Sequence, residues 1–559
     1  MAERGAADLV LTNASVLTMD PERPRATAVA VRDGEIVLAG DAAEAKDLTG
    51  PATELIDAGG RTLMPGIHDG HVHALDGGRL LSAANLRGER LDLDGFLDAL
   101  ADMLERDGSG DPDAWLNVYG WEPLSMARSP TRDDLDRLPT KRPILVNDGS
   151  AHTSVANSRA LELSAVGASA PDPEGGRLGR REDGEPDGVL WDEAIVLVSK
   201  QIPAASGEEN RRALRAAHEL MARRGITSYL DVWTRGPDLE AHSMLHDSGE
   251  MLVRPAISLA VTPESAPETE EMLAGLDRLR AEHGRPGIGA RTAKMFLDGV
   301  IEHPAHTAAM LEPYLDESGT PTADRGPTYF SQELTDRTVA ALDAAGWQVH
   351  MHAIGDRAVR SGLDAVQSAR ERNGPGDRRH TIAHVQLVDP ADFGRFAQLE
   401  VLPSIQAQWA RWDLYTVEAL RPYMGDERWR NTYPFARLQR AGARLCGGSD
   451  WPVDDELRPF HQIATAVTRT ASEDLPAQPQ PLFAEEAITM EESLVAHTAG
   501  SAFQMHQEGS SGTLREGMRA DLIVLDRDPL GFPPDQVHGT EVLLTAVGGE
   551  VVHRSEELN

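Results

Sequence analysis

The stretch TLMPGIHDGHVH, residues 62–73, decides the fold, because it joins a short apolar strand to two histidines at its end. His71 and His73 are two residues apart, so the period-two geometry of a strand points both side chains to one face. At the end of a strand in a parallel barrel, that face opens at the mouth, where active sites lie. Two imidazoles converging there suit a Zn²⁺-type ion, and the alternative is a histidine pair in an ordinary loop. His68 faces differently, and we expect a structural or supporting role for it.

Seven further segments have the short apolar pattern of buried strands, with amphipathic helical stretches such as 332–346 and 356–372 between them. They are ITSYLDVW (226–233), VRPAISLAV (253–261), ARTAKMFLDG (290–299), WQVHMHAIGD (347–356), RHTIAHVQLV (379–388), VLPSIQAQW (401–409) and ARLCGGSDWPV (443–453). Parallel neighbours need crossover connections, which are usually helical. Eight strands with intervening helices therefore predict an α/β fold, a (β/α)₈ TIM barrel.

Both ends of the chain are rich in β-patterns, and Gly548-Gly549 is a hairpin turn signal. The economical arrangement is one small β-sandwich assembled from both termini. The segment after the first barrel strand is too long for a simple βα unit, so we expect an insertion that caps the barrel mouth. The predicted division is a composite sandwich from 1–64 and 500–559, a barrel over 65–499, and an insertion over 78–205.

Composition excludes several classes of protein. The chain has 559 residues, one cysteine and a formal net charge of −36. A single cysteine excludes a disulfide framework and a Cys-rich metal site, and the negative charge disfavours binding to nucleic acid. No stretch has the length of a membrane span and no export signal is visible, so we expect a cytoplasmic protein with a small-molecule substrate and no membrane. The oligomeric state is open, with a homodimer as one candidate. Only four basic residues are lysine, which fits either a salt-rich (halophilic) cytoplasm or GC-rich codons.

Polar residues at the ends of later strands strengthen the case for a metal site. In the pairs His350/His352 and His380/His384 the residue nearest the strand end should reach the mouth, which favours His352 and His384. Asp450 follows the last strand, where two glycines let the backbone approach closely. Each could instead be a core histidine or a turn aspartate, but four strand-end sites in sequence order are hard to dismiss together.

Lys294 lies on a predicted central strand of a chain that otherwise prefers arginine. A buried lysine can lose its proton and add CO₂ to become a carbamate, which arginine cannot do. Such a group has two anionic oxygens and can bridge two metal ions. The alternative is an ordinary ion pair, for example with Asp298.

These residues lie in stretches that resemble the amidohydrolase superfamily, in its long YtcJ-like branch that includes N-substituted formamide deformylase. The matching stretches are LMPGIHDGHVH, KMFLDGVIEHPAHTAAMLEPY, VHMHAIGDRAV, AHVQLV, GGSDWPV, AVTRT and the tail from Leu494 to Leu530. The resemblance implies one or two divalent metal ions, zinc first. It implies that His71 and His73 hold one ion and His352 and His384 the other, that carboxylated Lys294 bridges them, and that Asp450 touches the first ion and the attacking water.

Further residues are candidates for contact with the substrate. The stretch DGSAHTSVANSRAL resembles a family segment near the substrate, which nominates His152 and Asn157, although His152 could equally be a structural hydrogen-bonding residue. Trp451 directly follows Asp450 and is expected to bind substrate. Three other tryptophans are better explained as packing, and Arg469 could meet an anionic group or a surface carboxylate; the three are Trp121, Trp191 and Trp409.

The predicted activity is metal-dependent hydrolysis of a non-peptide C–N bond, in an N-acyl, N-formyl or cyclic amide. A metal-activated hydroxide attacks the carbonyl, and Asp450 serves as general base and then general acid. The same chemistry could open a lactone or cleave another ester. A non-catalytic regulatory barrel is the alternative from a different class. An oxidoreductase is disfavoured, because no GxGxxG motif opens a βαβ unit.

Overall fold

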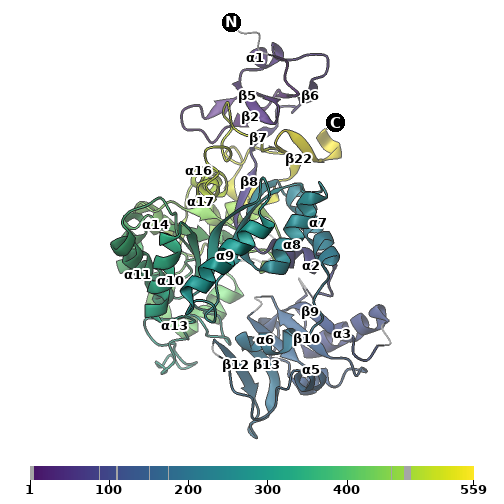
Figure 1. Cartoon of the computed structure of the whole chain (residues 1–559), viewed down its shortest axis with the longest axis vertical. Helices are drawn as coiled ribbons and strands as arrows, with labels where there is room; N and C mark the ends of the chain where they lie inside the picture. The colour runs from purple at the N-terminus through teal and green to yellow at the C-terminus, as the bar shows by residue number, and fades with distance from the viewer. Residues whose placement is uncertain are drawn as a thin grey trace.

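A barrel of parallel strands forms the centre of the molecule (Figure 1). The computed structural model describes residues 5–86, 89–108, 111–149, 152–173, 175–454, 456–470 and 480–558. Eight strands pair in the order β20-β19-β18-β17-β16-β15-β14-β8. They are β8 (Ile67–Val72), β14 (Ile226–Thr234), β15 (Arg254–Ala260), β16 (Gly289–Phe296), β17 (Gln348–Ala353), β18 (Thr381–His384), β19 (Leu402–Ile405) and β20 (Cys446–Gly447). Each lies within one residue of one of the eight predicted segments, and the (β/α)₈ prediction is confirmed.

Helices connect successive strands and pack against the outside of the barrel. Two of these helices, α10 (Gln332–Ala344) and α11 (Asp356–Asn373), illustrate the packing. They share a core with Val349 of β17, to which α10 contributes Val339 and Leu342 and α11 contributes Leu363 and Val366. Their spacing of three residues places each pair on one helical face, as expected for an amphipathic helix. The other connecting helices are α7 (Gly207–Arg223), α8 (Gly236–Asp247), α9 (Thr269–His283), α12 (Phe393–Gln398) and α14 (Phe435–Arg440).

The barrel closes between its first strand and the residues that follow its last strand. The backbone N–H of Asp450 donates to the carbonyl of His71 at 2.7 Å, and that of His73 donates to the carbonyl of Trp451 at 2.9 Å. These bonds continue the pairing beyond the two residues of β20. They also bring Asp450 beside both strand-end histidines.

Two further sheets are built from the ends of the chain, at the top of Figure 1. One has the order β23-β22-β21-β7-β2-β3 and unites both termini; the other, β5-β4-β1-β6, is N-terminal. Their facing side chains share one core, with Leu11 and Val31 from one sheet and Leu63 and Val524 from the other, so they form a sandwich. The strands are β1 (Leu9–Thr12), β2 (Ser15–Leu17), β3 (Arg25–Ala26), β4 (Ala28–Arg32), β5 (Glu35–Gly40), β6 (Glu54–Asp57), β7 (Thr62–Pro65), β21 (Leu522–Leu525), β22 (Val542–Val547) and β23 (Glu550–Arg554).

The insertion between β8 and β14 forms a sheet of its own at the opposite end of the barrel from the sandwich (Figure 1). Its strand order is β12-β13-β11-β10-β9, and its helices include α3 (Leu93–Asp107), α5 (Ser158–Leu163) and α6 (Glu193–Ser199). The strands are β9 (Leu116–Trp121), β10 (Ile144–Asp148), β11 (Thr153–Ala156), β12 (Gly176–Arg180) and β13 (Pro186–Asp192). The exact limits of the three parts, including 78–205, stay predictions.

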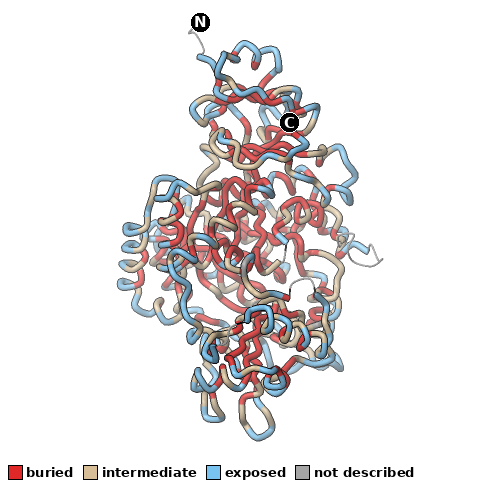
Figure 2. Tube along the Cα trace, turned by 90° about the vertical axis from the view of Figure 1, so that its right-hand side faces the viewer, coloured by how far each residue is buried: buried red, intermediate tan, exposed pale blue. Residues whose placement is uncertain are grey.

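Burial follows this division. Figure 2 shows buried residues running through the barrel and continuing into the sandwich at one end and the sheet of the insertion at the other. Within the described parts of the chain, no helix combines the length and the apolar character needed to cross a membrane.

Candidate metal centre

Three of the predicted ligands converge at the end of the barrel that faces the insertion. Nε2 of His71 lies 3.2 Å from Oδ1 of Asp450, and Nε2 of His73 lies 3.4 Å from the same oxygen. Their ligand atoms all lie within 4.8 Å of one another. Zn²⁺ with ligand bonds of about 2.0–2.2 Å in a tetrahedron separates its ligand atoms by roughly 3.4 Å. The spacing around Asp450 therefore fits a shared cation.

The backbone around Asp450 is specialised for this position. Asp450 adopts a φ of +55°, which is unfavourable for a residue with a side chain, so the surroundings must hold it. The Asp69 carboxylate does so by accepting the N–H groups of Ser449 at 2.9 Å and His71 at 3.2 Å. A Cβ on Gly448 would lie 2.6 Å from the Cβ of His71, so only glycine lets this turn approach β8.

A second group of predicted ligands lies beside the first. Ring centroids of His352 and His384 are 4.4 Å apart, and Nδ1 of His384 lies 3.9 Å from Oδ2 of Asp450. Nζ of Lys294 lies 3.5 Å from Nε2 of His71, and its side chain is fully buried. All six predicted ligands thus line one cluster on five barrel strands or the turns that follow them.

The protonation states of three histidines in this cluster suit a cation. Burial lowers the pKa values of His71, His352 and His384 well below the usual value, so these imidazoles are neutral, the form that binds metal. The carbonyl of Gly299 accepts from Nε2 of His352 at 3.0 Å, which fixes the proton there and leaves Nδ1 with a lone pair. Two atoms of this cluster, Oδ1 of Asp450 and Nδ1 of His384, are buried and have no hydrogen-bond partner within the described part of the chain. A cation would satisfy both atoms.

Two residues of this region were missed as contributors. Nε2 of His350 lies 2.8 Å from Nδ1 of His71, so His350 touches a ligand from below rather than being remote from the site. Its register opposite Lys294 in the β16–β17 ladder could have indicated this. Asp298, which does not pair with Lys294, accepts N–H groups from Ala309, Ile354 and Gly355 and lies 3.8 Å from Nε2 of His352.

The other two histidines have structural partners. His68 is buried, with Nδ1 donating to the Gly66 carbonyl and Nε2 paired with the Ser511 hydroxyl. His380 binds Asp343 and the N–H of Val349. Both are engaged away from the cluster.

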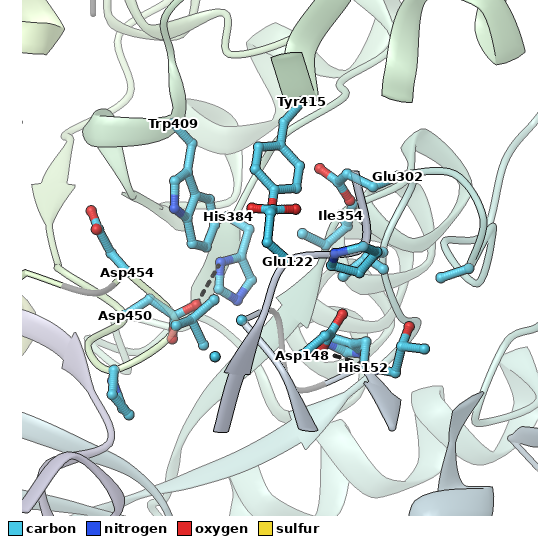
Figure 3. Close-up of a pocket in the computed structure, with 18 of the residues that line it drawn as sticks. Glu122, Asp148, His152, Glu302, Ile354, His384, Trp409, Tyr415, Asp450 and Asp454 are labelled. Carbon is cyan, nitrogen blue, oxygen red and sulfur yellow. Dashed lines mark hydrogen bonds and ion pairs between the residues drawn. The ribbon is translucent and has the colours of Figure 1, made fainter. Parts of the chain in front are cut away.

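A cavity of about 720 Å³ opens above the cluster, a size suited to a small molecule (Figure 3). Barrel residues form one side and the insertion the other, and the hydroxyl of Tyr415 donates to Glu122 across the two parts. His152 lines this cavity as predicted. Its Nδ1 is hydrogen-bonded to Asp192, and its ring centroid lies 6.1 Å from that of His352.

Several expected mouth residues lie elsewhere. Trp451 does not line the cavity: its side chain is 1% exposed and packs against helix α2 (Ala74–Ser82), where a Cβ on Gly77 would strike its ring. Asn157 caps helix α5 by accepting the N–H of Ala160. The aromatic wall instead includes Trp121 and Trp409, which were expected to be packing residues.

Two remaining candidates are also outside the cavity lining. Arg469 is fully buried, and its Nε donates to the carbonyl of Leu482. The guanidinium carbon of Arg177 lies over the ring of Trp191, 4.2 Å from the ring centroid. Neither residue meets the substrate space.

Comparison with known proteins agrees with this geometry. The chain is 30% identical over 559 residues to protein LONG AFTER FAR-RED 3 of Arabidopsis thaliana, covering 98% of this chain and 92% of that one. It is 29% identical to the putative amidohydrolase YtcJ of Bacillus subtilis (96% and 98% covered) and 26% identical to N-substituted formamide deformylase of Arthrobacter pascens (97% of each). An uncharacterized metal-dependent hydrolase from Pyrococcus horikoshii has the same fold, with a TM-score of 0.73, 24% identity, and 94% and 99% covered.

A family model described as the amidohydrolase family matches residues 54–553, which include the barrel and both C-terminal hairpin strands. The match spans every predicted ligand, and the resemblance found in the sequence motifs is confirmed. The chain belongs to the amidohydrolase family and is a hydrolase of that family.

Proposed function

We propose that the protein hydrolyses a carbon–nitrogen bond other than a peptide bond, in an N-acyl, N-formyl or cyclic amide. The observation that carries this proposal is the Asp450 carboxylate, one oxygen of which lies close to both His71 and His73. This carboxylate lines a cavity large enough for a small molecule. The relative named N-substituted formamide deformylase supports this class of bond.

One or two divalent ions, with zinc first, fit the donor set of this site. His71, His73 and Asp450 would hold one ion, and His352 and His384 a second. A bound divalent cation lowers the pKa of water from 15.7 towards about 7 and polarises a carbonyl oxygen. The protein supplies three imidazoles that burial keeps neutral, those of His71, His352 and His384, together with one carboxylate and a cavity of about 720 Å³.

Asp450 is the proposed general base and acid. Burial alone would raise its pKa, but the neighbouring His73, whose own pKa is raised, lowers it below its usual value, so the carboxylate is ionised and able to accept a proton. It takes a proton from the attacking water as the C–O bond forms, and returns that proton to the nitrogen as the C–N bond breaks. His152, which is hydrogen-bonded to Asp192, would donate a hydrogen bond to the carbonyl oxygen as negative charge develops there.

Lys294 is the proposed site of a carbamate. Burial lowers the pKa of its amine to about 7, so a large share is neutral at physiological pH and able to add CO₂. Its position 3.5 Å from a ligand atom of His71 would place the carbamate oxygens within the cluster.

The test is a hydrolysis screen with metal content measured on the same sample. Protein supplied with Zn²⁺ or Mn²⁺ is expected to hydrolyse at least one of a panel of N-formyl, N-acyl and cyclic amides, and a chelator is expected to abolish this. Asp450→Asn should fold but lose at least about a hundredfold in kcat, the usual scale for an acid–base group. Hydrolysis of lactones or esters but of no amide would contradict the assigned bond, and unchanged turnover in Asp450→Asn would remove Asp450 from the mechanism.

A further inference from the structure

The wall of the cavity carries more negative than positive groups. Eight carboxylates and three arginines are among the described residues that line it. Two of the arginines are paired within the wall, Arg79 with Asp76 at 2.8 Å and Arg411 with Asp413 at 3.0 Å. The carboxylates belong to Asp76, Glu89, Glu122, Asp148, Glu302, Asp413, Asp450 and Asp454. A cavity of this composition attracts cations and repels anions.

Glu302 is the lining carboxylate whose surroundings point most directly to an external cation. It lies in the segment after β16, where its Oε1 accepts from the neutral side-chain amide of Gln386 at 2.8 Å. No lysine or arginine in the described part of the chain forms an ion pair with it. The imidazole of His152 acts on it electrostatically but is itself hydrogen-bonded to Asp192. Burial raises the pKa of Glu302, a cost that a bound cation would offset.

Aromatic rings line the same cavity. Trp233 and Phe296 meet edge to face, with centroids 4.7 Å apart, and Trp409 stacks on His384 at 5.7 Å. The backbone N–H of Tyr433 donates to the carbonyl of Gln386, which places this lining tyrosine on the residue that holds Glu302. The seven lining aromatic residues are Tyr119, Trp121, Trp233, Phe296, Trp409, Tyr415 and Tyr433. Ring faces attract organic cations, most strongly those that shed water easily.

Glu302 and Asp450 lie apart in the wall of the cavity. Figure 3 shows Glu302 and Asp450 on opposite sides of His384. A substrate that places its carbonyl at Asp450 can therefore extend a second group toward Glu302.

We propose that this site prefers amides that carry an organic ammonium group, and that Glu302 is the residue that determines the preference. The inference rests on the proposed amide hydrolysis for its kinetic readout but also predicts binding, which needs no turnover. Glu302 contacts the charged end of the substrate and takes no part in breaking the bond.

The experiment uses a matched pair of probes, (4-formamidobutyl)trimethylammonium and N-(5,5-dimethylhexyl)formamide, which have the same shape but differ in charge. Binding to metal-loaded Asp450→Asn is measured by calorimetry, and hydrolysis by the wild type is measured with both probes. The charged probe is expected to bind about tenfold more tightly and to have about a tenfold higher kcat/KM. Glu302→Gln should abolish this difference by raising KM for the charged probe.

The control is Glu371→Gln, which removes the same charge from an exposed position on α11, where Glu371 accepts from Gln367. It should keep the full preference. Equal or weaker binding of the charged probe to Asp450→Asn, or an unchanged preference in Glu302→Gln, would overturn the inference. Selective binding without hydrolysis of any amide would sustain the inference and reject the proposed bond, whereas hydrolysis of the neutral probe alone would do the reverse.

Discussion

Among single residues, Lys294 depends most on its environment. An exposed lysine is a hydrated cation, but this one is fully buried, with its Nζ near Nε2 of His71 and 4.8 Å from the ring centroid of Phe296. Removal from water disfavours the ammonium form, which is why its pKa falls to about 7. The same burial that makes a charged lysine costly makes a neutral, CO₂-reactive one accessible.

The corresponding prediction concerns Lys294→Arg. Arginine stays charged and forms no carbamate, so the variant should bind less divalent metal per chain than the wild type. Native mass spectrometry of the wild type should show the added mass of one CO₂, absent from the variant. The control is Lys200→Arg at an exposed position, which should retain both properties. Equal metal content and no CO₂ adduct in any of the three proteins would remove the carbamate from the site.

At the scale of helices and strands, the eight barrel strands could be predicted because most of their residues are buried on both faces, which gives short segments rich in apolar residues. His71, His73 and Asp450 were also accessible, since each ends or follows such a run. The prediction that Trp451 binds substrate was wrong, because neighbouring residues in the sequence need not point their side chains the same way. The backbone turns at Asp450, and the indole of Trp451 packs into the core beside α2. The position of His350 beside His71 could not be predicted from one segment of sequence, because it depends on how β16 and β17 pair in the sheet.

A short helix of the insertion, α4 (Arg132–Leu135), provides a pH-dependent contact. Asp134 accepts both guanidinium nitrogens of Arg128, at 2.7 and 2.8 Å, and the N–H of Thr131. These bonds lower the pKa of Asp134 to about 2, with Arg128 the main cause. Because the folded pKa lies below the unfolded value of 3.8, the contact stabilises the protein fully above pH 4 and loses its effect as pH falls toward 2.

Asp134→Asn should therefore lower the thermal unfolding midpoint at pH 7, and the difference from the wild type should shrink as pH is lowered from 4 toward 3. Thermal scans of both proteins at each pH measure it. Asp98→Asn, at an exposed position of α3 in the same insertion, serves as a control for the loss of one negative charge. A difference that grows on acidification would contradict the assigned contact.

For the whole molecule, the lone cysteine reports on the integrity of the barrel. Cys446 lies in β20, is fully buried, and donates its thiol to the carbonyl of Pro403 at 3.4 Å. Burial raises its pKa far above the ordinary value, so the reactive thiolate is scarce in the folded state. A reagent can therefore reach this thiol only if the packing around β20 opens.

We expect Cys446 to resist an aromatic disulfide reagent in buffer and to react with a stoichiometry of one per chain in denaturant. The rise in reactivity with denaturant should follow loss of far-ultraviolet circular dichroism from the barrel. Cys446→Ser provides the blank. Rapid labelling of the native protein would show that the barrel opens far more readily than its packing indicates.

The pairing of β7 with β21 has a consequence for biosynthesis. Leu63 pairs with Val524, and β7 leads through one residue into β8, which carries the first histidines. During synthesis on the ribosome, the edge of β7 that pairs with β21 stays unpaired until almost all of the chain has emerged. Unpaired apolar edges of that kind favour aggregation, so nascent chains of this protein should depend on chaperones until the C-terminal strands arrive.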